Sequence, residues 1–218
     1  MQEYVMGNGA IALGALAAGV NLVAGYPGTP SSEILETISK YRHDGVYIEW
    51  SVNEKAAMEV AAAAAYSGAR AMVTMKQVGL NVAADPLMSL AYVGVKGGMV
   101  IVSADDPGPI SSQTEQDTRR FADFCRIPVF DPSSPEEAYK MIGEAFEYSE
   151  KYNTPVLFRP TTRVCHAYAS IDNCDSPSPK KYEGFVKDSK KWVIFPRLSF
   201  ANHIMIEKRN VEIGKDFS

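Results

Sequence analysis

Short apolar runs alternate with segments of helical periodicity along most of this chain, and this alternation constrains the fold more than any other feature. The apolar runs predict strands at residues 21–24, 46–50, 71–75, 99–103, 128–130 and 155–158. The periodic segments predict helices at residues 7–19, 30–41, 54–67, 79–92, 114–124 and 135–152. Such alternation is typical of parallel βα units. We therefore expect an α/β fold in three layers (α/β/α), with a mostly parallel sheet of about six strands.

The predicted helix at 135–152 has the clearest start signal. Ser134 is suited to the N-cap, Pro135 to the first helical position, and Glu137 completes a capping box. Two other predicted helices are unusual, since residues 10–18 and 56–65 are small and apolar on nearly every side. Such helices are buried on several faces. We infer that a partner subunit or domain covers one of them.

Size and composition limit the class of protein. The 218 residues allow one α/β domain of about 150 to 180 residues and an appendage. A net charge of −4 gives no general attraction for nucleic acid or anionic membranes. We find neither a membrane span nor a signal peptide. Three widely spaced cysteines (Cys125, Cys165 and Cys174) indicate free thiols in the cytoplasm and no metal site.

The character of the chain changes at about Cys174. Residues 175–181 are rich in proline, serine and lysine, as in linkers, and residues 192–197 are predicted to be extended. One interpretation of this tail is a disordered terminus. The other, which we favour, is a connection to a further domain outside this chain. We expect a domain over residues 1–172 and a linker, or the start of a following domain, over residues 173–218.

The turn at residues 25–32 follows the first predicted parallel strand. Pro27 and Pro30 restrain the backbone, Gly28 permits a positive φ, and Thr29 is placed to cap a helix that starts at Pro30. An ordinary βα turn explains this pattern. A binding site explains it too, because open α/β sheets bind ligands at the carboxyl ends of their strands. The Thr29 hydroxyl and the amides of the two following serines then face a carboxylate or carbonyl.

Glu54 begins a helix composed almost wholly of alanine. Ser51 and Glu54 have the spacing of a capping box, with Ser51 as N-cap and Glu54 at the third helical position. In that interpretation Glu54 only supports the helix start. Among small apolar side chains, however, a carboxylate is poorly solvated and becomes a candidate for proton transfer.

A third polar segment follows the strand at 71–75. Lys76, Gln77, Val78, Gly79 and Asn81 combine a cation and two amides with a glycine that opens a helix. They fit either the lining of a polar pocket or an ordinary loop with a solvated lysine. Two further segments end strands. Residues 104–109 form a stiff loop that fits a lid or a long turn, and residues 159–163 carry two arginines suited to acidic groups or a partner domain.

Four motifs together carry a resemblance to a known family. They read GYPGTPSSE at residues 25–33, NEKA at 53–56, MKQVGLNVAADP at 75–86 and FRPTTR at 158–163. In this order and spacing the chain resembles the pyrimidine-binding part of the thiamine-diphosphate-dependent 2-oxoacid:ferredoxin oxidoreductases, and among them the α subunits of the indolepyruvate type. The resemblance covers residues 1 to about 170 and implies the pyrimidine-domain fold of thiamine diphosphate enzymes.

The resemblance implies roles for several residues. In the family, the glutamate that matches Glu54 hydrogen-bonds the aminopyrimidine ring of thiamine diphosphate and supports proton transfer at the cofactor. The threonine that matches Thr29 lies beside the substrate carboxylate, and the loop that matches 76–81 borders the same site. The family decarboxylates 2-oxo acids oxidatively, passes electrons through iron–sulfur clusters to ferredoxin and forms acyl-coenzyme A. Homodimers or heterotetramers with a β subunit are implied.

The chain departs from the family pattern in two ways. It lacks the Gly-Asp-Gly and later Asn that hold Mg²⁺ and the diphosphate, and it lacks the cysteine runs that bind [4Fe-4S] clusters. We expect those parts, and a diphosphate-binding domain, outside this chain, and no turnover from this chain alone. The loop Ser103-Ala104-Asp105-Asp106 lacks the arginine of the pyruvate enzymes. This absence favours an aryl pyruvate over pyruvate as the substrate. A non-redox 2-keto acid decarboxylase subunit and a non-catalytic module of the same fold remain alternatives.

Overall fold

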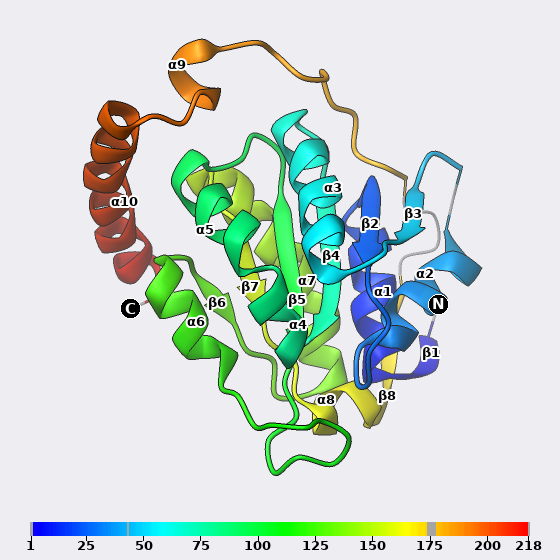
Figure 1. Cartoon of the computed structure of the whole chain (residues 1–218). Helices are drawn as coiled ribbons and strands as arrows, with labels where there is room; N and C mark the ends of the chain where they lie inside the picture. Colours follow the sequence, from blue (N-terminus) through cyan, green and yellow to red (C-terminus); the bar gives the residue numbers. More distant parts are fainter. Residues whose placement is uncertain (1, 43, 174–177, 218) are drawn as a thin grey trace.

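A computed structural model of the chain describes residues 2–42, 44–173 and 178–217 (Figure 1). Its centre is a six-stranded parallel sheet in the order β3-β2-β4-β5-β7-β6. The strands are β2 (Leu22–Gly25), β3 (Tyr47–Trp50), β4 (Ala71–Lys76), β5 (Met99–Ala104), β6 (Val129–Phe130) and β7 (Val156–Phe158). The predicted parallel sheet is confirmed, and all six predicted strands are present with bounds shifted by at most one residue.

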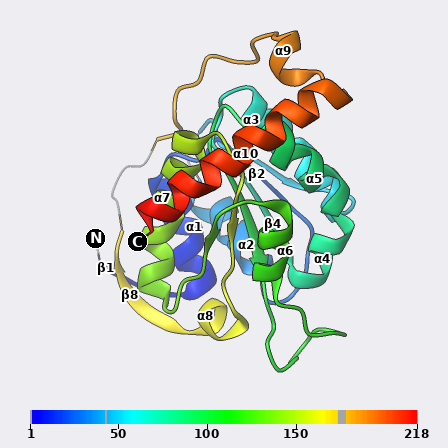
Figure 2. The ribbon, with the colours of Figure 1, turned by 90° about the vertical axis from the view of Figure 1, so that its left-hand side faces the viewer.

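Helices cover both faces of this sheet and complete the expected three layers (Figures 1 and 2). One face carries α1 (Gly7–Ala17), α2 (Ser32–Tyr41) and α7 (Pro135–Tyr152). The other carries α3 (Glu54–Tyr66), α4 (Gln77–Val82), α5 (Ala84–Val93) and α6 (Thr118–Cys125). Successive strand residues point to opposite faces. In β4, Met72 therefore joins one apolar core and Val73 the other.

A small second sheet was not predicted. β1 (Gln2–Met6) pairs antiparallel with β8 (Tyr168–Asp172), and the short helix α8 (Thr162–His166) precedes β8. In β8 only Ala169 and Ile171 are buried. Two buried residues at a spacing of two are too short a pattern for sequence periodicity to identify a strand. The pairing joins residues 2–6 to residues 168–172, which are far apart in the sequence.

The predicted single helix at 79–92 is wrong. This segment forms two helices, α4 and α5, which are separated at Ala83. Pro86 is the physical reason, because a proline has no N–H group to donate to the carbonyl four residues earlier and its ring collides with that carbonyl. Hydrogen bonding resumes when Leu87 N donates to the carbonyl of Ala83 at 3.1 Å.

The alanine-rich helices differ in how they are covered. In α1 every residue from Gly7 to Leu16 is buried inside the chain, against α2, α7 and α8. Its burial therefore needs no partner. In α3, Ala57, Met58 and Ala61 are buried, but the helix keeps an exposed side, and Val52 just before it is 82% exposed. The expected partner surface thus stays a prediction for α3 alone.

The tail contains more helix than the sequence indicated. α9 (Ser189–Trp192) is followed by α10 (Pro196–Asp216), which lies across α5 and α7 in Figure 2. Ile206 and Ile213 of α10 are buried, and Asp216 accepts hydrogen bonds from Lys151 and Tyr152. The prediction that residues 192–197 are extended is wrong at both ends of this segment, because its first residue lies in α9 and its last two lie in α10. The start of the predicted linker, with Cys174, lies outside the described residues. No helix in the described ranges is long and apolar enough to cross a membrane.

Candidate functional site

The order of the strands places the three predicted polar segments at one edge of the sheet. β2 lies between β3 and β4, and the chain passes from β2 to β3 through α2 on one face and from β3 to β4 through α3 on the other. This is a topological switch point, where open α/β sheets bind ligands beyond the carboxyl ends of the strands. The turn after β2, the start of α3 and the start of α4 all lie there. The structure therefore brings together Thr29, Glu54 and Lys76 at one edge.

Glu54 is the first residue of α3 and is buried, with 9% of its surface exposed. The predicted capping box is wrong. Asn53 is the N-cap and accepts a hydrogen bond from Ala56 N at 2.9 Å, while the Ser51 hydroxyl donates to Glu49 at 2.6 Å. The carboxylate of Glu54 has no hydrogen-bonding or ionic partner among the described residues. The helix thus has its cap without Glu54, and the glutamate is left for another role.

Gly79 lies against the Glu54 side chain. A Cβ atom at Gly79 would be 2.5 Å from Oε1 of Glu54 and 2.6 Å from its Cγ. Only a glycine leaves room for the carboxylate at this point. Val78 beside it is half-buried. The start of α4 is therefore shaped around the glutamate at the start of α3.

The turn after β2 folds differently from the prediction. α2 begins at Ser32, not at Pro30, and Ser31 takes the N-cap position, so Thr29 does not cap the helix. The Gly28 carbonyl accepts hydrogen bonds from both the amide and the hydroxyl of Ser31, at 2.8 and 2.9 Å. The Ser31 amide is therefore not available to a ligand. Pro27 and Thr29 are exposed at this edge.

Lys76 and Asn81 contact a neighbouring loop. The Lys76 methylenes pack on Gly28, since a Cβ at Gly28 would be 3.1 Å from Cγ and Cδ of the lysine. Nζ of Lys76 lies 3.4 Å from Oε1 of Gln113, and Nδ2 of Asn81 donates to Gln116 at 3.2 Å. Both partners lie in the long loop between β5 and α6, which forms the lower end of the molecule in Figure 1.

Gln77 is fully buried and ties the same loop to the end of β4. Its Oε1 accepts a hydrogen bond from Asp106 N at 2.6 Å, and its Nε2 donates to the carbonyl of Thr114. The predicted helix start at residue 114 is wrong, because α6 begins only at Thr118. The residues before it belong to this tethered loop.

The loop is organised by Asp106, a residue whose role the sequence did not reveal. Oδ2 of Asp106 accepts hydrogen bonds from the amides of Ile110, Ser111 and Ser112 at 3.0, 2.9 and 3.0 Å, and Oδ1 accepts from the Thr162 hydroxyl at 2.8 Å. Burial by itself raises the pKa of Asp106, but these hydrogen bonds favour the charged form and lower the pKa to about 2. An aspartate before Pro-Gly-Pro was the available signal, since such residues bind nearby backbone amides.

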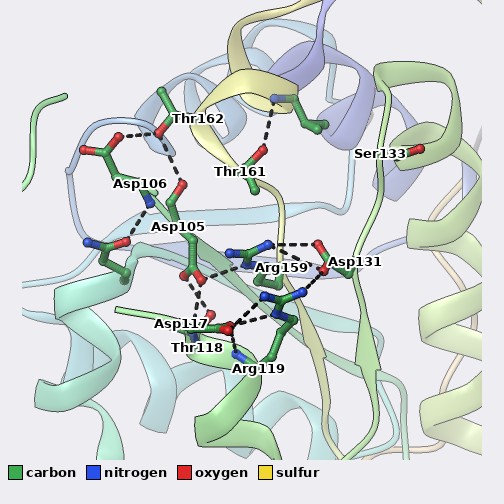
Figure 3. A network of polar contacts seen from close by, with 12 residues as sticks. Asp105, Asp106, Asp117, Thr118, Arg119, Asp131, Ser133, Arg159, Thr161 and Thr162 are labelled. Atoms are coloured by element: carbon green, nitrogen blue, oxygen red, sulfur yellow. Dashed lines mark hydrogen bonds and ion pairs between the residues drawn. The ribbon is translucent and has the colours of Figure 1, made fainter. Parts of the chain in front are cut away.

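Asp105 and Arg159 form a buried ion pair next to this loop (Figure 3). Nε of Arg159 lies 2.7 Å from Oδ2 of Asp105, and Asp105 also accepts hydrogen bonds from the amide and hydroxyl of Thr118. Arg159 further contacts Asp131 at 3.3 Å. The prediction that an arginine at 159–163 pairs with acidic groups is confirmed for Arg159. Arg159 and Asp105 are buried and bind each other, so this pair is structural.

The arrangement offers a definite chemistry. It combines a buried carboxylate that has no partner in the described ranges, an exposed hydroxyl and a half-buried ammonium group at one edge of a sheet. A heterocycle with a ring nitrogen fits the orphaned carboxylate of Glu54, because a carboxyl group and a ring nitrogen can share a proton. The described residues contain no group of three His, Cys, Asp or Glu side chains that could hold a metal ion.

A separate cavity of about 680 Å³ lies at the opposite edge of the sheet. It is lined by the carboxyl ends of α5 and α7 and by one side of α10, with Tyr92, Tyr152 and Arg209 among its residues. These helix ends precede β5 and β7, so they lie at the amino ends of the strands. The cavity is therefore not part of the candidate site.

Comparison with known proteins identifies the family. Residues 13–201 match the family described as pyruvate flavodoxin/ferredoxin oxidoreductase, thiamine diP-binding. The chain belongs to this family. The family assignment confirms the resemblance predicted from the four motifs and indicates a thiamine-diphosphate-binding domain.

Several relatives of this chain are longer proteins, of which the chain matches only a part. Indolepyruvate oxidoreductase subunit IorA of Thermococcus kodakarensis is 46% identical over 98% of this chain, which spans 34% of that relative. The IorA subunit of Archaeoglobus fulgidus is 49% identical over 78% of this chain and 28% of its own length. The chain thus spans about a third of the length of these curated relatives.

A solved structure supports the fold. The 2-oxoglutarate:ferredoxin oxidoreductase of Magnetococcus marinus matches 100% of this chain and 46% of its own with a TM-score of 0.77, at 16% sequence identity. The expected α/β fold of this enzyme class is therefore confirmed for the family domain described here.

Proposed function

We propose that this chain is the pyrimidine-binding domain of a thiamine-diphosphate-dependent aryl pyruvate:ferredoxin oxidoreductase, in its α subunit. The observation that carries the proposal is Glu54, a buried carboxylate that has no partner in the described chain and lies at the switch point of a domain of the thiamine-diphosphate-binding family. The names of the relatives favour indolepyruvate as the substrate class. The residues proposed to form the substrate and cofactor site are Pro27, Gly28, Thr29, Lys76, Gln77, Val78, Gly79 and Asn81. Among them Gln77 is buried and acts through the loop that it tethers.

When bound, thiamine diphosphate supplies a carbon nucleophile and an electron sink for the decarboxylation of a 2-oxo acid. The chain's own contribution is to hold the pyrimidine end. Glu54 keeps a proton between its carboxyl oxygen and the ring nitrogen, and Gly79 leaves the room that this carboxyl group needs. The Thr29 hydroxyl donates a hydrogen bond to the substrate. Lys76 and Asn81, with the loop that Gln77 tethers, border the substrate.

The remaining parts of the enzyme are proposed to lie outside this chain. A diphosphate-binding domain with Mg²⁺ and [4Fe-4S] clusters, from the same or a second α subunit, would complete the site, and a β subunit would join the assembly. The matched relatives are named as subunits and are about three times as long as the stretch aligned here. Ferredoxin and coenzyme A are the proposed reaction partners. The proposed assembly is a homodimer or a heterotetramer, and the proposed location is the cytoplasm. We propose residues 1–172 as the pyrimidine-binding domain and residues 173–218 as its connection to the next.

The relatives bear on the alternatives. The two IorA relatives, 46% and 49% identical to this chain, are named oxidoreductases. Another relative, 30% identical over 97% of this chain, is the 2-oxoglutarate synthase subunit KorA of Methanocaldococcus jannaschii. These names favour the redox enzyme over a non-redox decarboxylase. The third alternative, a non-catalytic module, is distinguished from both enzymes by the Glu54→Gln experiment.

Glu54→Gln in the complete enzyme, with its partner subunit, tests the proposal. A proton-transfer role predicts a loss of about a hundredfold or more in kcat. Thiamine diphosphate affinity, measured by calorimetry, should change by less than about tenfold, since an amide still forms a hydrogen bond. Glu144→Gln, at an exposed position of α7 on the other face of the sheet, is the control and should keep full activity. Near-normal turnover in Glu54→Gln would reduce Glu54 to a structural residue and contradict the catalytic assignment.

A further inference from the structure

We propose that Lys76 provides the cation that binds the carboxylate of the 2-oxo acid substrate. This inference rests on the proposed function, and it assigns a cation to the substrate carboxylate, for which the family resemblance gives this chain only the hydroxyl of Thr29. It follows from the position of the lysine, from its lack of an acidic partner and from the loop that surrounds it.

The position of Lys76 follows from strand alternation. Met72, Thr74 and Lys76 share one side of β4, and Met72 belongs to the core under α1 and α2. The lysine therefore leaves the sheet on the side of the turn after β2. Its methylenes pack on Gly28, at 3.1 Å from where a Cβ would lie. The ammonium group is thus placed beside the segment that carries Thr29, the residue proposed to face the substrate.

The charge of Lys76 is not neutralised by the protein. In the described part of the chain no carboxylate lies within ion-pair distance of its Nζ. Two other basic side chains near this edge are already paired, because Lys55 binds Asp85 at 2.9 Å and Arg159 binds Asp105 at 2.7 Å. A half-buried ammonium without a counter-ion attracts an anion more strongly than a fully solvated one.

The surrounding loop orients the ammonium without cancelling its charge. The polar atom near Nζ is Oε1 of Gln113, an uncharged acceptor at 3.4 Å. Gln113 lies between Asp106, which binds three loop amides, and Thr114, whose carbonyl accepts from Gln77. The loop around Gln113 is therefore fixed at both ends. An ammonium has three donors, so one contact to Gln113 leaves the others for a carboxylate.

The arrangement accounts for selection of a 2-oxo acid over its uncharged analogues. A charge-assisted hydrogen bond contributes about 1.5–3 kcal/mol, which corresponds to roughly 10- to 100-fold in affinity. An aldehyde or amide of the same shape lacks the negative charge and gains little from Lys76. The effect of the lysine is therefore expected on KM for the 2-oxo acid and on inhibition by carboxylates.

The test uses the complete enzyme with Lys76→Met, Lys76→Arg and the control Lys96→Met. Methionine keeps the packing on Gly28 and removes the charge, while arginine keeps the charge. Lys96 binds Glu183 at 2.9 Å, next to the amino end of β5. The readouts are KM for an aryl pyruvate, the inhibition constants of a 3-arylpropionate and of its amide, and thiamine diphosphate affinity by calorimetry.

We expect Lys76→Met to raise KM and the inhibition constant of the carboxylate by about 10- to 100-fold. The inhibition constant of the amide and the thiamine diphosphate affinity should stay within about twofold, Lys76→Arg should recover much of the loss, and Lys96→Met should resemble the wild type. An unchanged KM, or an equal loss for carboxylate and amide, or weakened cofactor binding, would overturn the assignment. If the wild-type enzyme oxidises no 2-oxo acid, the proposed function fails and this assignment fails with it. If the wild-type enzyme oxidises a 2-oxo acid and Lys76→Met has the same KM and inhibition constants, only the assignment of Lys76 is contradicted, and the proposed function stands.

Discussion

Glu54 and Gly79 are matched across the start of two helices. The glutamate opens α3 and the glycine lies in the first turn of α4, and a methyl group on Gly79 would come within 2.5 Å of Oε1 of Glu54. The carboxylate therefore occupies the space that a side chain at Gly79 would fill. This contact fixes where the proposed proton-transfer group can lie.

Gly79→Ala is predicted to displace the Glu54 carboxylate and to reduce turnover of the complete enzyme by at least about tenfold, because small displacements of catalytic groups are costly. The fold should persist, since the end of a flexible side chain can move away. The control is Gly143→Ala in α7, where an added Cβ would lie at an ordinary distance of 3.9 Å from the Cβ of Ala18. It should leave activity unchanged and stabilise the helix by up to about 1 kcal/mol. Equal activity in both variants would contradict the prediction.

Asp106→Asn is predicted to destabilise the chain in a pH-dependent way. The pKa of Asp106 is lowered to about 2 by its hydrogen bonds, from an ordinary value of 3.8. A lowered pKa means that the charged form contributes stability above about pH 4, and that this contribution is lost as the pH falls from about 4 through 2.

Urea unfolding of the wild-type chain and Asp106→Asn at several pH values checks this prediction. The wild type should be more stable by about 1–3 kcal/mol at pH 6, and the difference should shrink below pH 4. Asp85→Asn removes an exposed carboxylate that pairs with Lys55, so it should cost less than about 1 kcal/mol. A difference for Asp106→Asn that stays constant down to pH 3 would contradict the titration.

Arg159→Met is predicted to lower the free energy of unfolding by about 3–5 kcal/mol, because it leaves the fully buried carboxylate of Asp105 without its ion-pair partner. Arg119→Met is the comparison. Arg119 pairs with Asp117 and Asp131 but its side chain is half-exposed, so its loss should cost about 1 kcal/mol or less. Denaturant unfolding curves of the two variants give the result, and similar midpoints would show that the buried pair is not a major anchor.

The sequence by itself determined the strands of the central sheet and most of the helices that cover it. The start of α7 is an example, since Ser134 caps it as predicted and accepts a hydrogen bond from Glu137 N at 3.2 Å. The Glu137 side chain instead accepts from Ser133, one residue before the predicted partner. The alternation of strands and helices gave the three layers, and the four motifs gave the family, because both patterns lie in contiguous residues.

Only the tertiary structure decided which residues meet. Ser51 was the predicted cap for α3, yet its hydroxyl binds Glu49 and Asn53 caps the helix, which leaves Glu54 free to face Gly79. The roles of Asp106 and of the β1–β8 pair were also hidden. The physical reason is that these contacts depend on the order of strands in the sheet and on the face to which each helix returns. Neither is encoded in the spacing of residues along one segment.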